Sequence, residues 1–331
     1  MRLSICIPTY NRLEYLRKTV NSILESKNKE FDLIVCDNFS DDGTEEYCRN
    51  KAKIDKRLKY YRNTKNIGIS GNIHNCIKYC DTDYAYLLSD EDGLSSSMID
   101  SILCLLKKGY NLILPSVYDT QHNEYYIERK KRVYDKFIFK LIEETHGYLS
   151  GIIINKKCLN LETLEKYSKY ENNIYQHIPM MLMCCIKGNC FVTDDILCLK
   201  GKQQIEGRES LDGFTSNETV TELSNLPYYN SYNRIEQLKF FSEMARTITK
   251  SNKNQNIINR YFGKWAVIIY NSDFNLDKYG KPSKDIIKKT SRIEGIGYHF
   301  RIELLKYIII VKVKCIIKKL IFWDKLKVFL K

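Results

Sequence analysis

Glycine, proline and long hydrophobic runs are all scarce in this sequence of 331 residues. There are 15 glycines and 5 prolines, and 44% of the residues are hydrophobic. This composition is typical of a globular chain rather than a disordered one, and it predicts a folded protein of enzyme size. Even the apolar segment near the C-terminus is broken by lysines, and a bilayer span needs roughly 18 uncharged residues. The sequence therefore predicts no transmembrane helix.

A secretory signal and a disulfide framework are also missing. The first residues, MRLSICIPTYNR, contain no apolar signal segment, and the 12 cysteines show no regular spacing. We therefore expect a cytoplasmic protein whose free thiols behave mostly as small buried hydrophobic groups. His74, Cys76 and Cys80 lack a fourth ligand at a zinc-binding spacing, which favours a structural role for all three.

A basic excess is present, but it lies mainly at one end of the chain. The formal net charge is +13, and residues 301–331 alone carry a net of +7. Such an excess attracts polyanions. The sequence does not interleave arginines with aromatic residues, a pattern that would form a stacking surface for single-stranded nucleic acid. We therefore expect no nucleic-acid partner.

Strand-like apolar segments alternate with segments of helical periodicity in the first half of the sequence. RLSICIPTY precedes a stretch with apolar residues at helical spacing, and FDLIVCD precedes a polar loop and a second helical stretch. Two more strands are expected at LKYYRN and DYAYLLSD. This order predicts an α/β fold with helices around a mainly parallel sheet, whose ligand crevice lies at the carboxyl ends of the strands.

The pattern continues less regularly beyond residue 110. Strands are expected in NLILPSVY, HGYLSGIIINKKCL and CFVTDDILCL, and IYQHIPMMLMCCIKG predicts a buried helix that closes at Gly188. The polar composition from Lys200 to Asn225 is typical of a long loop. The rest of the chain is expected to be helical.

Three consecutive acidic residues, Asp90, Glu91 and Asp92, follow one of the predicted strands. Neighbouring carboxylates repel one another unless they share a cation. Mg²⁺ and Mn²⁺ often bind through one or two carboxylates together with water and substrate phosphates. Acidic triplets also occur on solvated surfaces, so the spacing alone leaves both interpretations open. Thr9 and Asp37 also follow predicted strands and can converge with the triplet on one site.

Four motifs occur in a specific order over the first 95 residues: CIPTYNR, VCDNFSDDGT, NTKNIGISGN and YLLSDEDGL. Together they resemble the inverting family 2 glycosyltransferases. The resemblance implies a GT-A fold, which is a Rossmann-like α/β domain with a mixed sheet that binds a nucleotide-diphospho-sugar. It covers about the first 110 residues well and weakens toward residue 200.

The resemblance implies donor-binding residues in four loops: Pro8, Thr9, Tyr10 and Arg12 in the first, Asp37 in the second, Asn66, Gly68 and Asn72 in the third, and Asp90 in the fourth. Asp37 matches the acid that hydrogen-bonds the base. Asp90 and Asp92 match the Asp-x-Asp motif, which implies bound Mn²⁺ or Mg²⁺, with Asp92 as the first choice for direct contact. Taken singly, Asp37, Asn66 and Gly68 also fit ordinary turn chemistry.

An inverting transfer needs a general base for the acceptor hydroxyl. The family usually supplies it from a Glu-Asp pair about a dozen residues before a glycine, and counting back from Gly188 reaches Gln176 and His177. His177 is therefore the predicted base, since a histidine pKa near 6.5 suits this role. The alternative is that His177 makes only a capping or packing contact at the start of the helix. Glu171 or Glu144 would then be the base.

The C-terminal segment LLKYIIIVKVKCIIKKLIFWDKLKVFLK has the pattern of a basic amphipathic helix at an anionic membrane surface. The alternative is a helix that packs on the fold or against a second copy in a homodimer. Lys202 and Arg208, in the long loop, are either a lid over the diphosphate or ordinary solvated charges.

We predict a glycosyltransferase, bound peripherally to the inner face of the cell membrane, that moves a sugar from a nucleotide diphosphate, with UDP favoured, to a glycan or lipid-linked acceptor. Residues 1–110 would bind the donor, 111–200 the acceptor, and 201–331 would form the loop and the helical extension. The alternatives are a sugar-nucleotide nucleotidyltransferase, for which a Gly-rich basic phosphate loop is missing, and an inactive nucleotide-binding scaffold.

Overall fold

The computed structural model describes residues 2–144, 148–169, 175–201, 231–274 and 284–307. The chain forms two compact units, Met1–Thr215 and Ser216–Lys331. The predicted boundaries at residues 110 and 200 remain predictions. Glu171, Lys202, Arg208 and the segment 308–331 lie outside the described residues.

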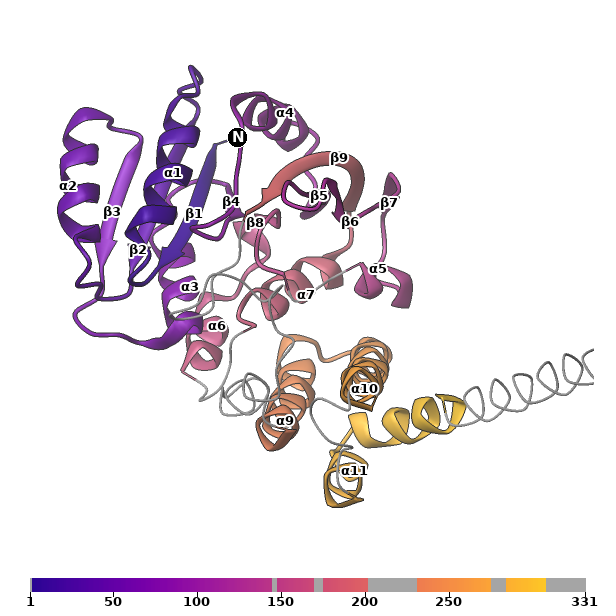
Figure 1. The fold of residues 1–331 in the computed structure, drawn as a ribbon. Coiled ribbons are helices and arrows are strands. Elements are labelled where there is room, and N and C mark those ends of the chain that lie inside the picture. Colours follow the sequence, from indigo (N-terminus) through magenta and orange to yellow (C-terminus); the bar gives the residue numbers. More distant parts are fainter. Residues whose placement is uncertain (1, 145–147, 170–174, 202–230, 275–283, 308–331) are drawn as a thin grey trace, which may run out of the picture. The chain divides into compact units, whose positions relative to one another are not determined.

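The first unit is built on one nine-stranded mixed sheet in the order β3-β2-β1-β4-β8-β5-β9-β7, with β6 paired to β5 (Figure 1). Strands β1 to β4 run parallel, β8 is antiparallel to both its neighbours, and β5 and β9 are again parallel. The strands are β1 (Leu3–Thr9), β2 (Phe31–Asp37), β3 (Leu58–Arg62), β4 (Tyr84–Leu87), β5 (Leu112–Asp119), β6 (Glu124–Ile127), β7 (Arg132–Tyr134), β8 (Ile153–Asn155) and β9 (Cys190–Lys200).

Helices connect these strands, and the helices that follow β1, β2 and β3 are the ones that the sequence pattern predicts. They are α1 (Leu13–Leu24), α2 (Thr44–Ile54), α3 (Gly68–Lys78), α4 (Ser96–Leu106), α5 (Phe139–Glu143), α6 (Leu161–Ser168) and α7 (His177–Lys187), with a 3₁₀ turn at Lys156–Cys158. The predicted buried helix is α7, and it ends at Gly188, whose φ of 70° favours glycine.

The two faces of the sheet are buried under different helices. Leu3, Ile5 and Ile7 of β1 belong to a core cluster that also contains the buried residues of α1 and α4. Side chains alternate along a strand, so Cys6 points to the other face. There its Sγ lies 3.8 Å from the carbonyl oxygen of Cys76 in α3. A sheet covered on both faces explains the nearly continuous burial of β1 and β2, and it confirms the predicted α/β class.

The second unit is helical in its described part. It contains α9 (Ser231–Ile248), α10 (Asn252–Phe274), α11 (Lys284–Thr290) and a further helix over residues 296–307. Phe241 and Phe262 stack with ring centroids 4.0 Å apart and join α9 to α10. Across the described ranges, we find no helix with both the length and the apolar character that a membrane span requires.

Candidate functional site

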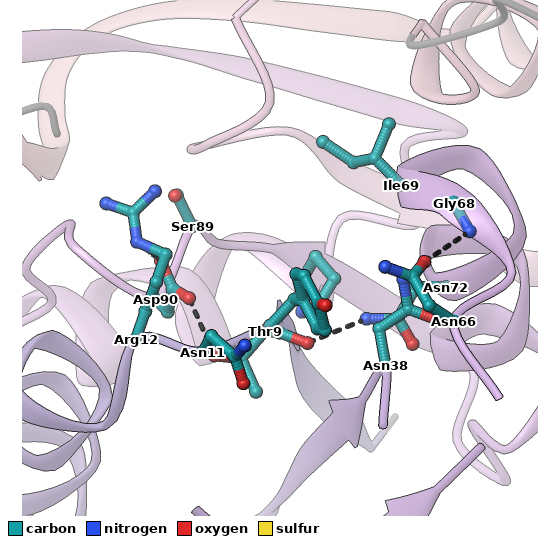
Figure 2. A pocket seen from close by; sticks show the side chains of 12 residues that line it. Thr9, Asn11, Arg12, Asn38, Asn66, Gly68, Ile69, Asn72, Ser89 and Asp90 are labelled. Carbon is teal, nitrogen blue, oxygen red and sulfur yellow. Dashed lines mark hydrogen bonds and ion pairs between the residues drawn. The ribbon is translucent and has the colours of Figure 1, made fainter. Parts of the chain in front are cut away.

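Four loops at the carboxyl ends of β1, β2, β3 and β4 converge on a cavity of about 630 Å³ (Figure 2). The parallel arrangement of these strands brings the loops to one edge of the sheet, as the sequence predicts. Eight of the nine predicted donor-binding residues line the cavity: Pro8, Thr9, Tyr10, Arg12, Asn66, Gly68, Asn72 and Asp90.

Asp90 provides the carboxylate of the cavity wall. Its Oδ2 accepts a hydrogen bond of 2.7 Å from the Thr9 hydroxyl, and its Oδ1 lies 3.3 Å from Nε of Arg12 (Figure 2). Arg12 also pairs with Glu91, so one guanidinium bridges two carboxylates of the loop that contains residues 90–92, which we call the acid loop. Burial raises the pKa of Asp90 to about 6, although Arg12 and Thr9 oppose this shift.

A network of asparagine amides forms another part of the wall. Asn63 donates to the side-chain oxygens of Asn38 and Asn72, each over 3.0 Å. Asn38 in turn donates to Asn66 over 2.7 Å, and Asn72 donates to the carbonyl oxygen of Cys36 at 2.8 Å. Because each amide satisfies another, the ends of β1, β2 and β3 are held in fixed positions around the cavity.

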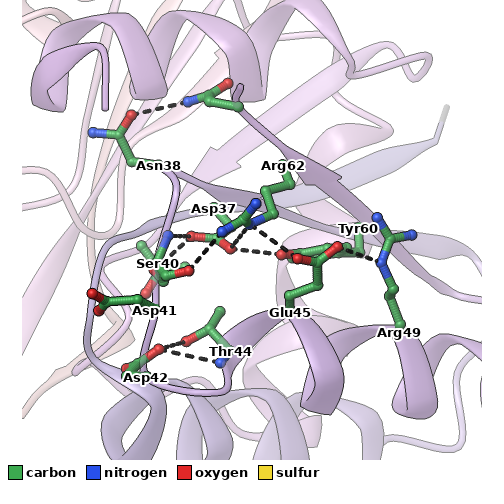
Figure 3. Close-up of polar contacts among 12 residues, drawn as sticks. Asp37, Asn38, Ser40, Asp41, Asp42, Thr44, Glu45, Arg49, Tyr60 and Arg62 are labelled. Carbon is green, nitrogen blue, oxygen red and sulfur yellow. Dashed lines mark hydrogen bonds and ion pairs between the residues drawn. The ribbon is translucent and has the colours of Figure 1, made fainter. Parts of the chain in front are cut away.

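Asp37 does not line this cavity but anchors the β2 loop internally (Figure 3). Its side chain is fully buried. Oδ1 accepts hydrogen bonds from the backbone N–H and the hydroxyl of Ser40, and Oδ2 accepts one of 2.6 Å from Tyr60. Arg62 Nε lies 3.4 Å from Oδ2. The expected contact of Asp37 with a nucleotide base remains a prediction, and the geometry gives this carboxylate a structural role.

Asp92 has surroundings different from those of Asp90, although only one residue separates them. Its Oδ2 accepts hydrogen bonds from Ser150 and, over 2.6 Å, from Tyr148. Its Oδ1 accepts one of 2.8 Å from the backbone N–H of Gly201. The residue is 1% exposed and does not line the cavity. Burial raises the pKa of Asp92, while the donors from Ser150, Tyr148 and Gly201 act in the opposite direction.

Gly201 must be a glycine for this contact to form. A Cβ atom at this position would lie 1.8 Å from the carbonyl oxygen of Glu91. The backbone also pairs Gly93 with Leu199 in both directions, at 2.7 and 3.0 Å. The end of β9 is therefore attached to the acid loop through main-chain contacts.

The candidate bases lie apart from the cavity lining. His177 is the first residue of α7, is 2% exposed, and has its ring 6.0 Å from that of Tyr175. Glu144 pairs with Arg129 at 2.8 Å and accepts a hydrogen bond from Tyr134. Both oxygens of Glu144 are thus engaged by partners. His177 remains a predicted base.

The residues of the site fit a divalent cation that is held by one protein carboxylate and by oxygens of the donor. Within the described residues, no three His, Cys, Asp or Glu side chains converge on a common point that could hold a metal. A cation bound by one carboxylate and by the oxygens of a diphosphate needs no such cluster. Asp90 satisfies this requirement because it faces the cavity, whereas the Asp92 oxygens already have three protein donors.

Four residues of the lining were not predicted from the sequence: Asn11, Asn38, Ile69 and Ser89. One unused signal was the density of asparagines in RNTKNIGISGNIHN, a stretch that supplies Asn63, Asn66 and Asn72 to the network. Asn38 directly follows Asp37 in the sequence, and it is the neutral residue of the two that lines the cavity.

Comparison with known proteins gives the site a family context. The model of "Glycosyl transferase family 2" matches residues 4–182. The chain is 32% identical over 110 residues to the GalNAc(5)-diNAcBac-PP-undecaprenol beta-1,3-glucosyltransferase of Campylobacter jejuni. This match covers 33% of this chain and 36% of the relative. It is 34% identical over 136 residues to the abequosyltransferase RfbV of Salmonella typhimurium, covering 40% of this chain and 37% of that relative. The matches thus span little more than a third of each relative.

A solved structure shares the fold over most of the chain. TarS 1–349 of Staphylococcus aureus, crystallised with UDP-GlcNAc, has a TM-score of 0.60 at 12% identity, and the match covers 92% of this chain and 89% of TarS. Its complex with UDP gives a TM-score of 0.58 at 13% identity, with 92% and 88% covered. These likenesses confirm the expected GT-A fold. The family model covers more than half of the sequence, and the chain therefore belongs to glycosyl transferase family 2.

Proposed function

We propose that this chain transfers a sugar from a nucleotide diphosphate, with UDP as the favoured nucleotide, to a hydroxyl of a surface glycan or lipid-linked glycan. The observation that carries the proposal is Asp90, a carboxylate in the wall of a large cavity at the carboxyl ends of parallel strands. The asparagine network and the Thr9 and Arg12 contacts give this cavity a fixed polar lining, which suits a nucleotide better than an apolar ligand.

A divalent cation, Mn²⁺ or Mg²⁺, belongs to the proposal. Asp90 would hold it together with oxygens of the donor diphosphate, and Asp92 is the second candidate. When bound, such a cation neutralises charge on the departing diphosphate. Arg12 lines the same cavity and supplies a fixed positive charge beside Asp90, so it is suited to orient the anionic donor.

The reaction we propose is a direct displacement with inversion. His177 takes the proton of the acceptor hydroxyl as that oxygen attacks the anomeric carbon, and the nucleotide diphosphate leaves. Binding energy from the nucleotide positions the sugar for this attack. Inversion and the identity of the base both derive from the resemblance to the family.

Relatives and sequence chemistry support an acceptor at the membrane. The Campylobacter relative is named for an undecaprenol-linked substrate. Residues 301–331 of this chain carry a net charge of +7. In the described start of this segment, Leu305 is 59% exposed and lies beside exposed Lys306. We propose that this basic end binds the anionic inner surface of the cell membrane and brings the site to its acceptor.

The test of the donor site is thermal unfolding with UDP, GDP, CDP and dTDP, each with and without Mn²⁺. A ligand that binds only the native state raises the melting temperature as its concentration increases. We expect one nucleotide, UDP first, to stabilise the wild type only with Mn²⁺ present. Asp90→Asn should lose this effect, and Asp81→Asn should keep it, because Asp81 is an exposed carboxylate that does not line the cavity.

Other outcomes separate the alternatives. If no nucleotide shifts the transition under any condition, the donor site is wrong. If a nucleotide binds but no UDP-sugar is hydrolysed or transferred to any acceptor, the chain is a nucleotide-binding scaffold. Formation of a sugar nucleotide from a nucleoside triphosphate and a sugar phosphate would establish the nucleotidyltransferase alternative instead.

A further inference from the structure

Two neighbouring tyrosines on β6 are exposed to nearly the same extent but have different surroundings. Tyr125 is 45% exposed and Tyr126 is 46% exposed. Successive side chains of a strand point to opposite faces. Tyr125 packs edge-on against Tyr118, with ring centroids 5.7 Å apart. Tyr126 instead packs against Tyr148, at 4.9 Å between centroids.

Tyr126 is connected to the acid loop through one intermediate residue. The hydroxyl of Tyr148 donates to Oδ2 of Asp92 over 2.6 Å, so the Tyr148 side chain joins the Tyr126 ring to Asp92. The exposed aromatic surface of Tyr126 therefore lies one side chain away from the acid loop.

Lys200 holds the Tyr126 ring from a second direction. Its Nζ lies 4.8 Å from the ring centroid and 2.6 Å from Oδ2 of Asp119. A cation and the face of an aromatic ring attract each other, and the ion pair with Asp119 fixes the position of the Lys200 ammonium. Tyr126 is therefore an exposed ring with restricted orientation, and a restricted ring loses little conformational entropy when a ligand binds to it.

The acid loop contributes both to the donor cavity, through Asp90, and to the surroundings of this ring, through Asp92. Asp90 lines the cavity, whereas the side-chain oxygens of Asp92 accept hydrogen bonds from Tyr148, Ser150 and Gly201, which do not line it. In a direct displacement the acceptor oxygen approaches the anomeric carbon from the side opposite to the leaving diphosphate. A surface beyond the acid loop is where such an acceptor can be held without competing for the donor cavity.

We propose that Tyr126 is the stacking platform for a pyranose ring of the acceptor glycan, an inference that rests on the proposed function. A pyranose presents a face of C–H groups with hydroxyls around its rim, and the flat face of a tyrosine matches the C–H groups. His122, whose side chain is 46% exposed, contacts the same carboxylate oxygen as Lys200, with its Nδ1 3.1 Å from Oδ2 of Asp119. The platform gives the acceptor subsite a preference for cyclic sugars over open-chain polyols.

Saturation-transfer NMR on the full chain tests this directly. The probes are methyl β-glucopyranoside and the methyl β-glycoside of N-acetylgalactosamine, with sorbitol as an open-chain control. We expect signals from the ring C–H protons of at least one glycoside and none from sorbitol. Tyr126→Ala should weaken glycoside binding about three- to tenfold, and Tyr126→Phe should retain it, because stacking needs the ring and not the hydroxyl.

Tyr125→Ala is the matched control, since it removes an equally exposed ring from the same strand. It should leave the glycoside signals unchanged. Equal losses in the two alanine variants, unchanged binding in Tyr126→Ala, or no signal from the wild type with either glycoside would each overturn the proposal. The measurement contains no nucleotide, so a failure here is distinct from failure of the donor site, which the UDP melting experiment reports separately.

Discussion

The hydroxyl of Thr9 donates a hydrogen bond of 2.7 Å to Asp90, and this contact joins the loop after β1 to the acid loop after β4. The two residues lie 81 positions apart in the sequence, and they meet because β1 and β4 are adjacent parallel strands. Asp90 is thereby held in the cavity wall, whereas Asp92 is held by Tyr148, Ser150 and Gly201.

The two carboxylates should therefore respond differently to the same substitution. Asp92→Asn replaces one of the two carboxylate oxygens that accept hydrogen bonds from Tyr148, Ser150 and Gly201, so at least one buried donor loses its acceptor. An unsatisfied buried donor costs about 1–3 kcal/mol of stability. Asp90→Asn keeps an acceptor for Thr9. We expect urea unfolding to show a clear loss of stability for Asp92→Asn and a smaller change for Asp90→Asn. Tyr148→Phe, which removes one donor, should cost about 1 kcal/mol.

The opposite pattern would reassign the ligand. If Asp92→Asn unfolds at the wild-type urea midpoint and yet abolishes the Mn²⁺-dependent effect of the nucleotide, Asp92 is the metal ligand, as the sequence motif predicts. The hydrogen bonds of Asp92 would then be secondary to its role in the site.

Asp37 should act on stability through its partners. Replacing a buried, paired carboxylate leaves its hydrogen-bond and ion-pair partners without a charged acceptor. We therefore expect Asp37→Asn to lower the free energy of unfolding by about 3 kcal/mol. Tyr60→Phe should cost about 1 kcal/mol, and the double variant should show a coupling energy of about 0.5–3 kcal/mol. Tyr61→Phe is the control because Tyr61 stacks on Tyr79 instead. Strict additivity of Asp37→Asn and Tyr60→Phe in urea unfolding would contradict this account.

The ion pair of Asp119 with Lys200 predicts a pH dependence of stability. Burial by itself raises the pKa of Asp119, but hydrogen bonds from Lys200 and His122 outweigh it and hold the pKa well below its usual range. In the unfolded chain the pKa is about 3.9. Asp119 therefore stabilises the fold above that pH, and the contribution is lost as pH falls toward the folded-state pKa.

This dependence can be measured by comparing urea unfolding of the wild type and Asp119→Asn at neutral pH and at about pH 3. The stability difference between the two proteins should shrink on acidification. A difference of the same size at both pH values would mean that ionised Asp119 contributes nothing specific through Lys200.

His177 can be tested as a base or as a packing residue. If it is the base, His177→Ala should reduce sugar transfer by about 10²–10⁴-fold and leave nucleotide binding unchanged. The residue is 2% exposed, so a packing role predicts instead a lower free energy of unfolding with transfer retained in the folded fraction. Transfer rates normalised to folded protein, together with urea unfolding, distinguish the two.

The parts of the fold with strong local patterns followed from the sequence. Strands β1 to β4 and helices α1 to α3 were predictable because apolar runs and helical periodicity alternate clearly there. Strands β6 and β7 were not, since their residues are mostly exposed and lie in a charged stretch without apolar alternation. The three-residue strand β8 was expected, but its antiparallel place between β4 and β5 depends on tertiary pairing.

The candidate site divides in the same way. Convergence of Thr9 and Asp90 followed from the rule for parallel sheets. The internal roles of Asp37 and Asp92 did not, because their partners are supplied by tertiary structure: Tyr60 comes from β3, and Tyr148, Ser150 and Gly201 lie more than 50 residues from Asp92. A sequence motif names acidic residues but does not determine which of them faces the cavity.

The most direct test of the donor site is calorimetric titration of UDP in the presence of Mn²⁺ into the wild type and into Asp90→Asn. We predict that the wild type binds UDP and that the affinity of Asp90→Asn for UDP is lower by at least about tenfold. The two affinities should become equal when Mn²⁺ is removed. Equal affinity of both proteins in the presence of Mn²⁺ would contradict the assignment of Asp90, and with it the donor site described here.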